Sequence, residues 1–361
     1  MTQEKNMKIL HTSDLHLGSA LTSRLSPARI RERKAELIQS FERQVEEGLM
    51  RGVRIFIIAG DLFDTERVGR GVKESVISVI RRASSIDFLY LPGNHERLAL
   101  FDGSVEIPEN LKLFREDWTY FDYDYVTVAG KTALGAGTFD GLELDPGRKN
   151  IVVLHGGIAD RSGEDTVGLA DAAGRGIDYL ALGHYHSYSC TRIDARGIAH
   201  YSGTPQGRGF DEAGECGFCI VDTNGSELYH SFIPHAKRRI LIRKADVSDV
   251  RDRADVDSAV AAALDGVSPS DLVRVVLTGR HAPEVNPDLD TIRKRYEDRY
   301  YHFEAEDESG LRIDPEEYRY DRSLKGEFIR LVLGRCGLAD EERDAIIRAG
   351  LGALMGDLGD I

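Results

Sequence analysis

The chain has 361 residues, of which 41% are hydrophobic and 30% are charged, and this length predicts two or three domains with substantial cores. The formal net charge of −14 argues against a protein that coats nucleic acid or membranes through bulk positive charge, although a local basic groove is compatible with it. Residues 1–240 carry 29 basic and 34 acidic side chains, whereas the remainder carries 18 and 27. The acidity therefore lies mostly in the C-terminal third.

The start of the chain and its cysteines predict the compartment. The first ten residues lack the apolar segment of a signal peptide, and no apolar run approaches the roughly 18 residues of a membrane-spanning helix. Four cysteines are too few for a disulfide framework. Cys216 and Cys219 lie in a strand-like segment, where we expect core packing rather than a redox pair or half of a zinc site. We expect a cytoplasmic protein that does not associate with membranes.

The first 190 residues alternate short apolar runs with amphipathic helical segments. Uninterrupted apolar runs of this length predict strands that are buried on both faces. The runs are Lys8–His11, Ile55–Ala59, Phe88–Leu91, Ile151–Leu154 and Tyr179–Leu182. Ser26-Pro27 predicts the start of the first helix.

Later segments predict antiparallel pairing. Phe218–Asp222 and Glu227–Phe232 flank Asn224-Gly225, a strong hairpin signal, and Ala129-Gly130-Lys131 predicts another hairpin turn. An early βαβ-like part and a later antiparallel part together predict a layered α/β sandwich.

A domain boundary is predicted near Pro234–Arg239. Strand and helix patterns then alternate and predict a small α+β domain over residues 236–320. Two helices are predicted within residues 321–361, and the apolar stripe Ile346–Leu354 on the second could contact a partner, a second copy or the protein's own core. Residues 1–235 form the first predicted domain.

Each of the five buried runs ends in side chains that can bind metal ions. These are Asp14 and His16, Asp61 and Asp64, Asn94 with His95, His155, and finally His184 and His186. Ligands of open α/β sheets bind outside the carboxyl ends of the strands, so we expect these residues at one edge. Oxygen and imidazole donors without thiolates suit Mn²⁺, Fe²⁺ or Zn²⁺. Seven ligands with one shared carboxylate fit two ions, which suits in-line displacement at phosphorus.

Each motif alone has an ordinary structural explanation. A single Asp-x-His or Gly-Asp-x-x-Asp can be a turn followed by a helix cap, and a lone histidine such as His155 can be a hydrogen-bonded core residue. Five such motifs in order, each after a buried strand, are very unlikely to arise by chance. The series therefore favours a centre of two metal ions.

The motifs DLH, GDLFD, GNHE, HGG and GHYH resemble those of the calcineurin-like metallophosphoesterases over about residues 7–235. The resemblance implies a four-layer α/β/β/α sandwich with a small C-terminal α+β cap and terminal helices. It implies two divalent ions, most simply Mn²⁺, with Fe, Zn or Mg as alternatives. The implied ligands of one ion are Asp14, His16, Asp61 and His186, and those of the other are Asp61, Asn94, His155 and His184.

The same resemblance implies roles for two further residues. His95 would be the general acid that protonates the leaving oxygen, or the cation that stabilises the transition state. Asp64 is not a usual ligand of the family and would orient a ligand histidine through the ring atom that does not bind the metal.

Within the family, the spacing and the GDLFD form look most like the SbcD-type bacterial DNA-repair nucleases, a branch that includes YhaO-like exonucleases. Thr65 follows Asp64 where the Ser/Thr protein phosphatases carry an arginine, and Ser202–Arg208 also resembles the SbcD branch. The resemblance implies a metal-dependent DNA exonuclease or endonuclease, with terminal helices that contact an SbcC-type coiled-coil ATPase. The chain is shorter and more acidic than expected of a DNA-clamping nuclease.

Basic residues near the first two motifs are candidate DNA contacts. They include Arg24, Arg29, Arg31, Arg33, Lys34, Arg67, Arg70 and Lys73, with Arg208 after the last motif. Arg208 and Arg67 are the candidates for contact with the substrate phosphate. A solvated helix face explains the same residues equally well.

Two other functions remain open at this stage. The chain could be a phosphoesterase that acts on a small nucleotide or a phosphoprotein. It could also be a non-catalytic scaffold that keeps the fold, although such proteins usually lose ligands, and all seven predicted ligands and His95 are present here.

Overall fold

The structure is a computed structural model that describes residues 7–21, 25–93, 96, 100, 103–224, 228–283, 285 and 287–355. The chain divides into two compact units, Met1–Arg239 and Ile240–Ile361. Among the helices described, none is both long enough and apolar enough to cross a membrane.

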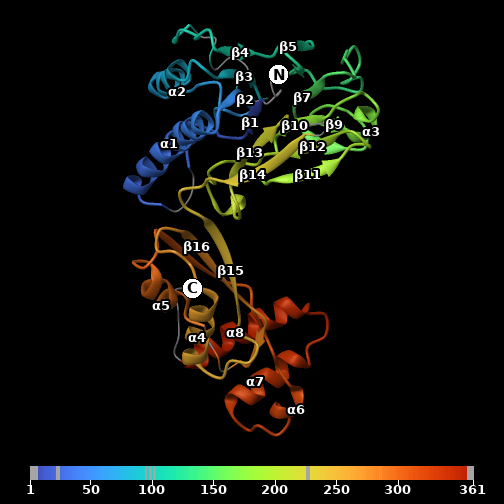
Figure 1. The fold of residues 1–361 in the computed structure, drawn as a ribbon. Coiled ribbons are helices and arrows are strands. Elements are labelled where there is room, and N and C mark those ends of the chain that lie inside the picture. The colour runs from blue at the N-terminus through green and yellow to red at the C-terminus, as the bar shows by residue number, and fades with distance from the viewer. Residues whose placement is uncertain are drawn as a thin grey trace. The chain divides into compact units, whose positions relative to one another are not determined.

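The first unit contains a six-stranded sheet with the order β14-β13-β1-β2-β3-β4 (Figure 1). Its strands are β1 (Lys8–Thr12), β2 (Val53–Ala59), β3 (Asp87–Leu91), β4 (Leu111–Leu113), β13 (Gly217–Asp222) and β14 (Tyr229–Pro234). Strands β1 to β4 are parallel, whereas β13 is antiparallel to β1 and to β14. The pairing of Asp222 with Tyr229 confirms the hairpin predicted around Asn224, and Gly225 lies outside the described residues.

A second six-stranded sheet has the order β11-β12-β10-β7-β6-β5. Its strands are β5 (Thr119–Tyr123), β6 (Val126–Gly130), β7 (Lys149–His155), β10 (Tyr179–Gly183), β11 (Ser189–Arg192) and β12 (Ile198–Tyr201). The four central strands are parallel, and β5 and β11 are antiparallel edge strands. All five predicted buried strands are thereby confirmed, as β1, β2, β3, β7 and β10.

The turn predicted at Ala129-Gly130-Lys131 is wrong. Gly130 is the last residue of β6, and the hairpin instead turns between Tyr123 and Val126. A Cβ atom at Gly130 would lie 2.8 Å from the Phe114 ring and from the Val153 carbonyl oxygen. Glycine at this position therefore allows close packing inside the sandwich, which a local sequence pattern does not distinguish from a turn.

Four layers make up the first unit. Helices α1 (Pro27–Arg51) and α2 (Arg70–Arg82) pack on one face of the β1 sheet, on the left in Figure 1. The two sheets share a second cluster that includes Ile57 and Val153, and a third covers the outer face of the β10 sheet. This outer layer consists mainly of loops, together with helix α3 (Leu169–Ala172) and the short strands β8 (Gly157–Ala159) and β9 (Thr166–Gly168). A 3-10 turn, η1 (Phe210–Glu212), follows β12. The predicted α/β/β/α sandwich is confirmed, with a thin fourth layer.

Local sequence signals set the ends of α1. The Ser26 hydroxyl accepts a hydrogen bond from the Arg29 amide, Pro27 begins the helix, and Gly52 ends it at a φ of 73°. Cys216 and Cys219 are buried, as predicted for core residues.

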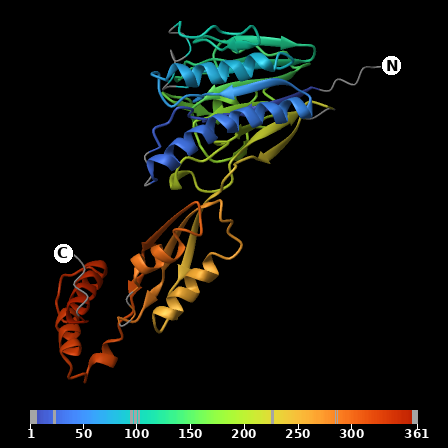
Figure 2. The ribbon, with the colours of Figure 1, turned by 90° about the vertical axis from the view of Figure 1, so that its left-hand side faces the viewer.

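The second unit begins with a three-stranded parallel sheet, ordered β15-β16-β18. Its elements are β15 (Ile240–Asp246), α4 (Arg253–Ala263), β16 (Leu272–Thr278), α5 (Leu289–Tyr296) and β18 (His302–Asp307). Both helices pack in one cluster on the same side of the sheet (Figure 2), as right-handed crossovers require. A second cluster joins β19 (Gly310–Leu311), which pairs with β17 (Arg280–His281), to α6 (Pro315–Tyr318), α7 (Leu324–Leu333) and α8 (Asp340–Met355).

A buried ion cluster fixes the end of the first unit to α1. The Glu36 carboxylate accepts hydrogen bonds from Arg33 at 2.7 Å and Arg238 at 2.8 Å, and Lys237 Nζ lies 3.0 Å from it. Glu36 is 1% exposed and Arg33 is fully buried. Burial raises the pKa of Glu36, but the hydrogen bonds from these three cations outweigh burial and lower it.

Replacing Glu36 tests the contribution of this cluster to stability. Glu36→Ala leaves the buried Arg33 without its carboxylate, so we expect a loss of about 3–5 kcal/mol in the free energy of unfolding at neutral pH. Glu47→Ala on the same helix removes an exposed pair with Arg51 and should cost about 0.3–0.5 kcal/mol. Because the folded-state pKa of Glu36 lies below its usual 4.5, its contribution should be present above that pH and disappear on further acidification. Urea denaturation at several pH values measures both effects, and equal losses for the two variants would contradict this account.

Candidate metal centre

The predicted ligands follow strands of both sheets at the same edge. Asp14 and His16 lie in the loop after β1, and Asp61 follows β2. His155 is the last residue of β7 and pairs with Gly183 at the end of β10, directly before His184. Parallel strands β1 and β2, and likewise β7 and β10, therefore deliver their carboxyl ends to one place. The predicted ligand Asn94 and the predicted acid His95 lie outside the described residues.

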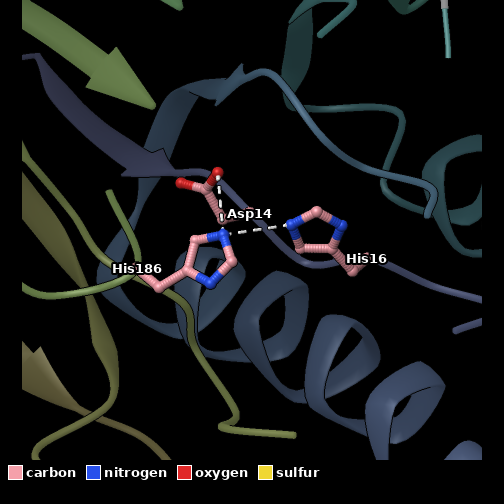
Figure 3. A group of neighbouring side chains, drawn as sticks. All are labelled: Asp14, His16 and His186. Atoms are coloured by element: carbon pink, nitrogen blue, oxygen red, sulfur yellow. Dashed lines mark hydrogen bonds and ion pairs between the residues drawn. The ribbon is translucent and has the colours of Figure 1, made fainter. Parts of the chain in front are cut away.

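Asp14, His16 and His186 form one group whose side chains point toward one another (Figure 3). The Nε2 atoms of His16 and His186 are 3.3 Å apart, and His186 Nε2 lies 3.8 Å from a carboxylate oxygen of Asp14. Ligand atoms that share one ion at bonds of about 2.0–2.2 Å lie about 3–3.5 Å apart. The histidine pair falls in this range and the Asp14 oxygen lies slightly farther away, so small movements of the side chains would let all three bind one metal ion.

A second group consists of Asp14, Asp61 and His155. Asp61 Oδ2 lies 3.5 Å from His155 Nε2 and 3.7 Å from His16 Nε2, so this carboxylate faces histidines of both groups. His184 is more exposed, and its ring centroid lies 5.7 Å from that of His155. The structure thus brings six of the seven predicted ligands to the same edge, with Asp61 between two potential ion positions.

The backbone at the candidate ligands is unusual. Asp14, His16, Asp61 and His184 have φ values of 53°, 45°, 51° and 109°, in the region that favours glycine. Such conformations cost about 1–3 kcal/mol each and persist only where the surroundings enforce them. Here the Asp14 amide donates to the Gly60 carbonyl at 3.1 Å and the His16 amide to the Asp61 carbonyl at 2.9 Å. These hydrogen bonds join the loops that follow β1 and β2.

The charges of the site match a bound cation. Burial raises the pKa of Asp14 to about 6, which reflects the cost of a carboxylate that is fully removed from water. Burial also lowers the pKa of His155, but Asp61 and Asp14 outweigh it and raise that pKa to about 9. Two buried carboxylates thus draw positive charge to the site, and the carboxylate and imidazole donors around them fit divalent ions of the Mn²⁺, Fe²⁺ or Zn²⁺ type.

Glu96 is a supporting residue that the sequence prediction did not identify. Its buried carboxylate accepts hydrogen bonds from the amides of Leu62 at 2.8 Å, Phe63 at 2.5 Å and Gly93 at 3.2 Å. It therefore ties the loop after β2 to the loop after β3. The only sequence signal was its place at the end of the GNHE motif.

The side chains of Asp64, Arg208 and Glu212, here called the Arg208 cluster, lie behind two of the histidines. Asp64 lies 3.3 Å from His16 Nδ1, the second-layer position predicted for it, and 2.9 Å from Arg208. Arg208 also contacts Glu212, which lies 2.7 Å from His186 Nδ1. Glu212 was not predicted, because nothing in the sequence links it to a metal motif.

The predicted basic residues fall into two groups. Arg67 is exposed in the loop before α2, and Arg29, Arg31 and Lys34 are exposed or half-exposed on the first turns of α1. Arg33 and Lys73 are buried, so the predicted surface contact with DNA is wrong for these two. Arg24 lies outside the described residues.

Residues 7–188 match the calcineurin-like phosphoesterase family, and this match spans half of the chain. The chain belongs to that family. Family members are hydrolases that use divalent metal ions, in agreement with the two groups of donor atoms at the sheet edge.

Solved structures that match this chain include an archaeal phosphodiesterase, with 15% identity over 63% of this chain and 100% of that one, and a TM-score of 0.36. The purple acid phosphatase PPD1 from yellow lupin seeds has 13% identity over 66% of this chain and 52% of that one, with a TM-score of 0.38. The sulfate thiohydrolase SoxB of Thermus thermophilus has 14% identity over 72% and 60%, with a TM-score of 0.35. The family assignment rests on the match over residues 7–188.

Gly60 provides a test of the centre that does not depend on a substrate. It has a φ of 91°, and a Cβ atom there would collide with the His155 ring. We expect Gly60→Ala to displace His155 and weaken metal binding at least about tenfold. Gly52→Ala is the matched control, because Gly52 has a φ of 73° and nothing within 4 Å of the added atom. Isothermal titration with Mn²⁺ measures the affinity, and equal metal binding by both variants would refute the assigned role of His155.

Proposed function

We propose that this phosphoesterase is a Mn²⁺-dependent DNA phosphodiesterase of the SbcD type that acts as an exonuclease or endonuclease in DNA repair. The observation that carries the proposal is the pair of donor groups that share Asp14, with Asp61 in the second group and 3.7 Å from His16 of the first. The GDLFD motif supports the branch, since Asp64 contacts His16 and is followed by Thr65 rather than by the arginine of the protein phosphatases.

In this proposal, Asp14, His16, Asp61 and His186 hold one ion, and Asp61, His155 and His184 hold the other together with Asn94. When bound, two such ions supply an activated water and a positive clamp for in-line displacement at phosphorus. The Asp61 carboxylate faces the histidines of both ion positions. The turns after β1 and β2 hold the ligands in place before substrate arrives. His95 would donate the proton to the leaving oxygen.

Exposed and half-exposed cations support a DNA substrate. Arg29, Arg31 and Lys34 near the start of α1, and Arg67 before α2, are contributed by the segments that follow the first two metal motifs. Such side chains can contact phosphates on either side of the scissile bond and set the position of a strand. The chain's net charge of −14 predicts modest affinity without a partner.

A substrate panel with Mn²⁺ tests this function. We expect degradation of single-stranded or end-containing DNA, and at least a thousandfold loss of activity in Asp61→Ala and in His95→Ala. The panel also contains a cyclic nucleotide, a nucleotide pyrophosphate and a phosphopeptide. Arg196→Ala is the control, since its pair with Asp178 lies before β10, at the opposite end of the strand from the ligands. Efficient hydrolysis of small phosphoesters without any action on DNA would overturn the nuclease proposal, and a protein that binds no metal would favour a scaffold.

An SbcC-type coiled-coil ATPase is the proposed partner, and the terminal helices are its proposed contact. In the predicted stripe on α8, Ile347 and Leu351 are buried against α7, whereas Ile346 and Leu354 are 38% and 43% exposed. On α7, Leu324 and Leu331 are 69% and 66% exposed and lie seven positions apart, on the same side of the helix.

Substituting this exposed face tests the partnership. The double variant Leu324→Asp, Leu331→Asp should lose co-purification with the ATPase and keep metal-dependent hydrolysis, because neither side chain is part of a core. Leu49→Asp on α1, which replaces a leucine of 44% exposure, is the control. Deletion of residues 321–361 should have the same effect as the double variant. The alternative is that this face joins two copies of the chain. Analytical ultracentrifugation would then show a dimer for the wild type and a monomer for the double variant.

A further inference from the structure

The Arg208 cluster connects two histidines that belong to the same predicted ion position. Arg208 Nη1 lies 2.9 Å from Asp64 Oδ1, and its Nη2 and Nε lie 2.6 and 2.9 Å from Glu212 Oε1. Its amide donates to the other oxygen of Glu212 at 2.6 Å. The same two carboxylates face the Nδ1 atoms of His16 and His186. The opposite ring atoms, both Nε2, are 3.3 Å apart at the candidate centre (Figure 3).

The Arg208 cluster can orient the two histidines toward the ion. Glu212 accepts a hydrogen bond from His186 Nδ1 at 2.7 Å, which fixes the tautomer of this histidine and leaves its Nε2 lone pair directed at the ion. Asp64 places a carboxylate oxygen 3.3 Å from His16 Nδ1 and so faces the second histidine as an ion-pair partner. Asp64 and Glu212 are 148 positions apart in the sequence and would repel each other without a cation between them. The guanidinium provides several donors in a rigid planar fork, so it binds both carboxylates at once in a fixed geometry, whereas a lysine offers a compact charge on a flexible chain.

The second predicted ion position is held differently. His155 Nδ1 lies 2.9 Å from the carbonyl oxygen of Ala59, the last residue of β2. The orientation of His155 therefore depends on the backbone of the sheet and not on Arg208. This asymmetry makes the two positions distinguishable by experiment.

We propose that Arg208 is a positioning residue that sets the affinity of the ion position formed by Asp14, His16 and His186, and leaves the position of His155 unaffected. It acts through Asp64 and Glu212 and does not serve as the contact for the substrate phosphate, since its guanidinium is engaged by both carboxylates and its side chain is only 19% exposed. The inference needs the metal centre alone and holds whether the substrate is DNA or a small phosphoester.

Metal binding by the full chain tests the proposal without reference to activity. Isothermal titration with Mn²⁺ should give two ions per chain for the wild type. In Arg208→Ala one of the two should bind about 10–100-fold more weakly, while the other keeps its affinity. Electron paramagnetic resonance of the Mn²⁺-loaded variant at limiting metal should then show isolated ions in place of an exchange-coupled pair. Arg196→Ala, which removes another paired arginine of the same unit, should bind both ions as the wild type does.

Two further variants separate positioning from phosphate contact. Glu212→Gln keeps the shape of the side chain and removes its charge, so it should weaken binding of the same ion. The affinity of that ion in the double variant Arg208→Ala, Glu212→Gln should be no lower than in either single variant. Arg208→Lys should be intermediate. If Arg208→Ala binds both ions normally and only raises KM for the phosphoester, Arg208 contacts substrate and the proposal is overturned. If Arg208→Ala does not fold, as judged by its thermal melt, Glu212→Gln decides: normal binding of both ions overturns the proposal, and loss of one ion supports it.

Discussion

Two buried carboxylates, Asp14 and Asp61, are the constraint on which the rest of the site depends. Removing a carboxylate from water costs several kcal/mol unless opposite charge and hydrogen bonds compensate. Asp14 receives hydrogen bonds from the Ser13 hydroxyl at 2.6 Å and from the His184 amide at 3.0 Å, and imidazoles surround both carboxylates. These contacts compensate the charge only in part, and divalent cations at the two donor groups would complete the compensation.

Further from the ligands, negative and positive groups alternate. The histidines contact Asp64 and Glu212, these carboxylates contact Arg208, and the preceding carbonyl of Gly207 accepts a hydrogen bond from the buried Arg33 of α1. Arg33 in turn pairs with Glu36, which also binds the segment at the end of the first unit. Ion pairs and one hydrogen bond to a backbone carbonyl thus connect the centre to α1, and each charged side chain in this series lies next to an opposite charge or a polar group.

The parts of the fold that could be predicted were those specified by local pattern. Apolar runs such as Ile55–Ala59 identify a strand buried on both faces wherever they occur, and Ser26-Pro27 identifies a helix start. The glycine at position 130 was misassigned, because its role is to let Phe114 and Val153 approach β6, and both are distant in sequence. The burial of Arg33 and Lys73 was missed for the same reason, since it depends on which face of a helix meets other elements.

The amino-acid sequence by itself determined the strands, the order of the metal motifs and the chemical types of the ligands, because each is encoded within a few neighbouring residues. Only the tertiary structure decided which donor atoms lie close to one another, and which residues support them. Asp64 and Glu212 meet through Arg208, and Glu96 joins the loops after β2 and β3, because the carboxyl ends of strands from different parts of the chain lie side by side. Contacts between residues so far apart along the chain leave no periodic or local trace, so they appear only when the sheets are assembled.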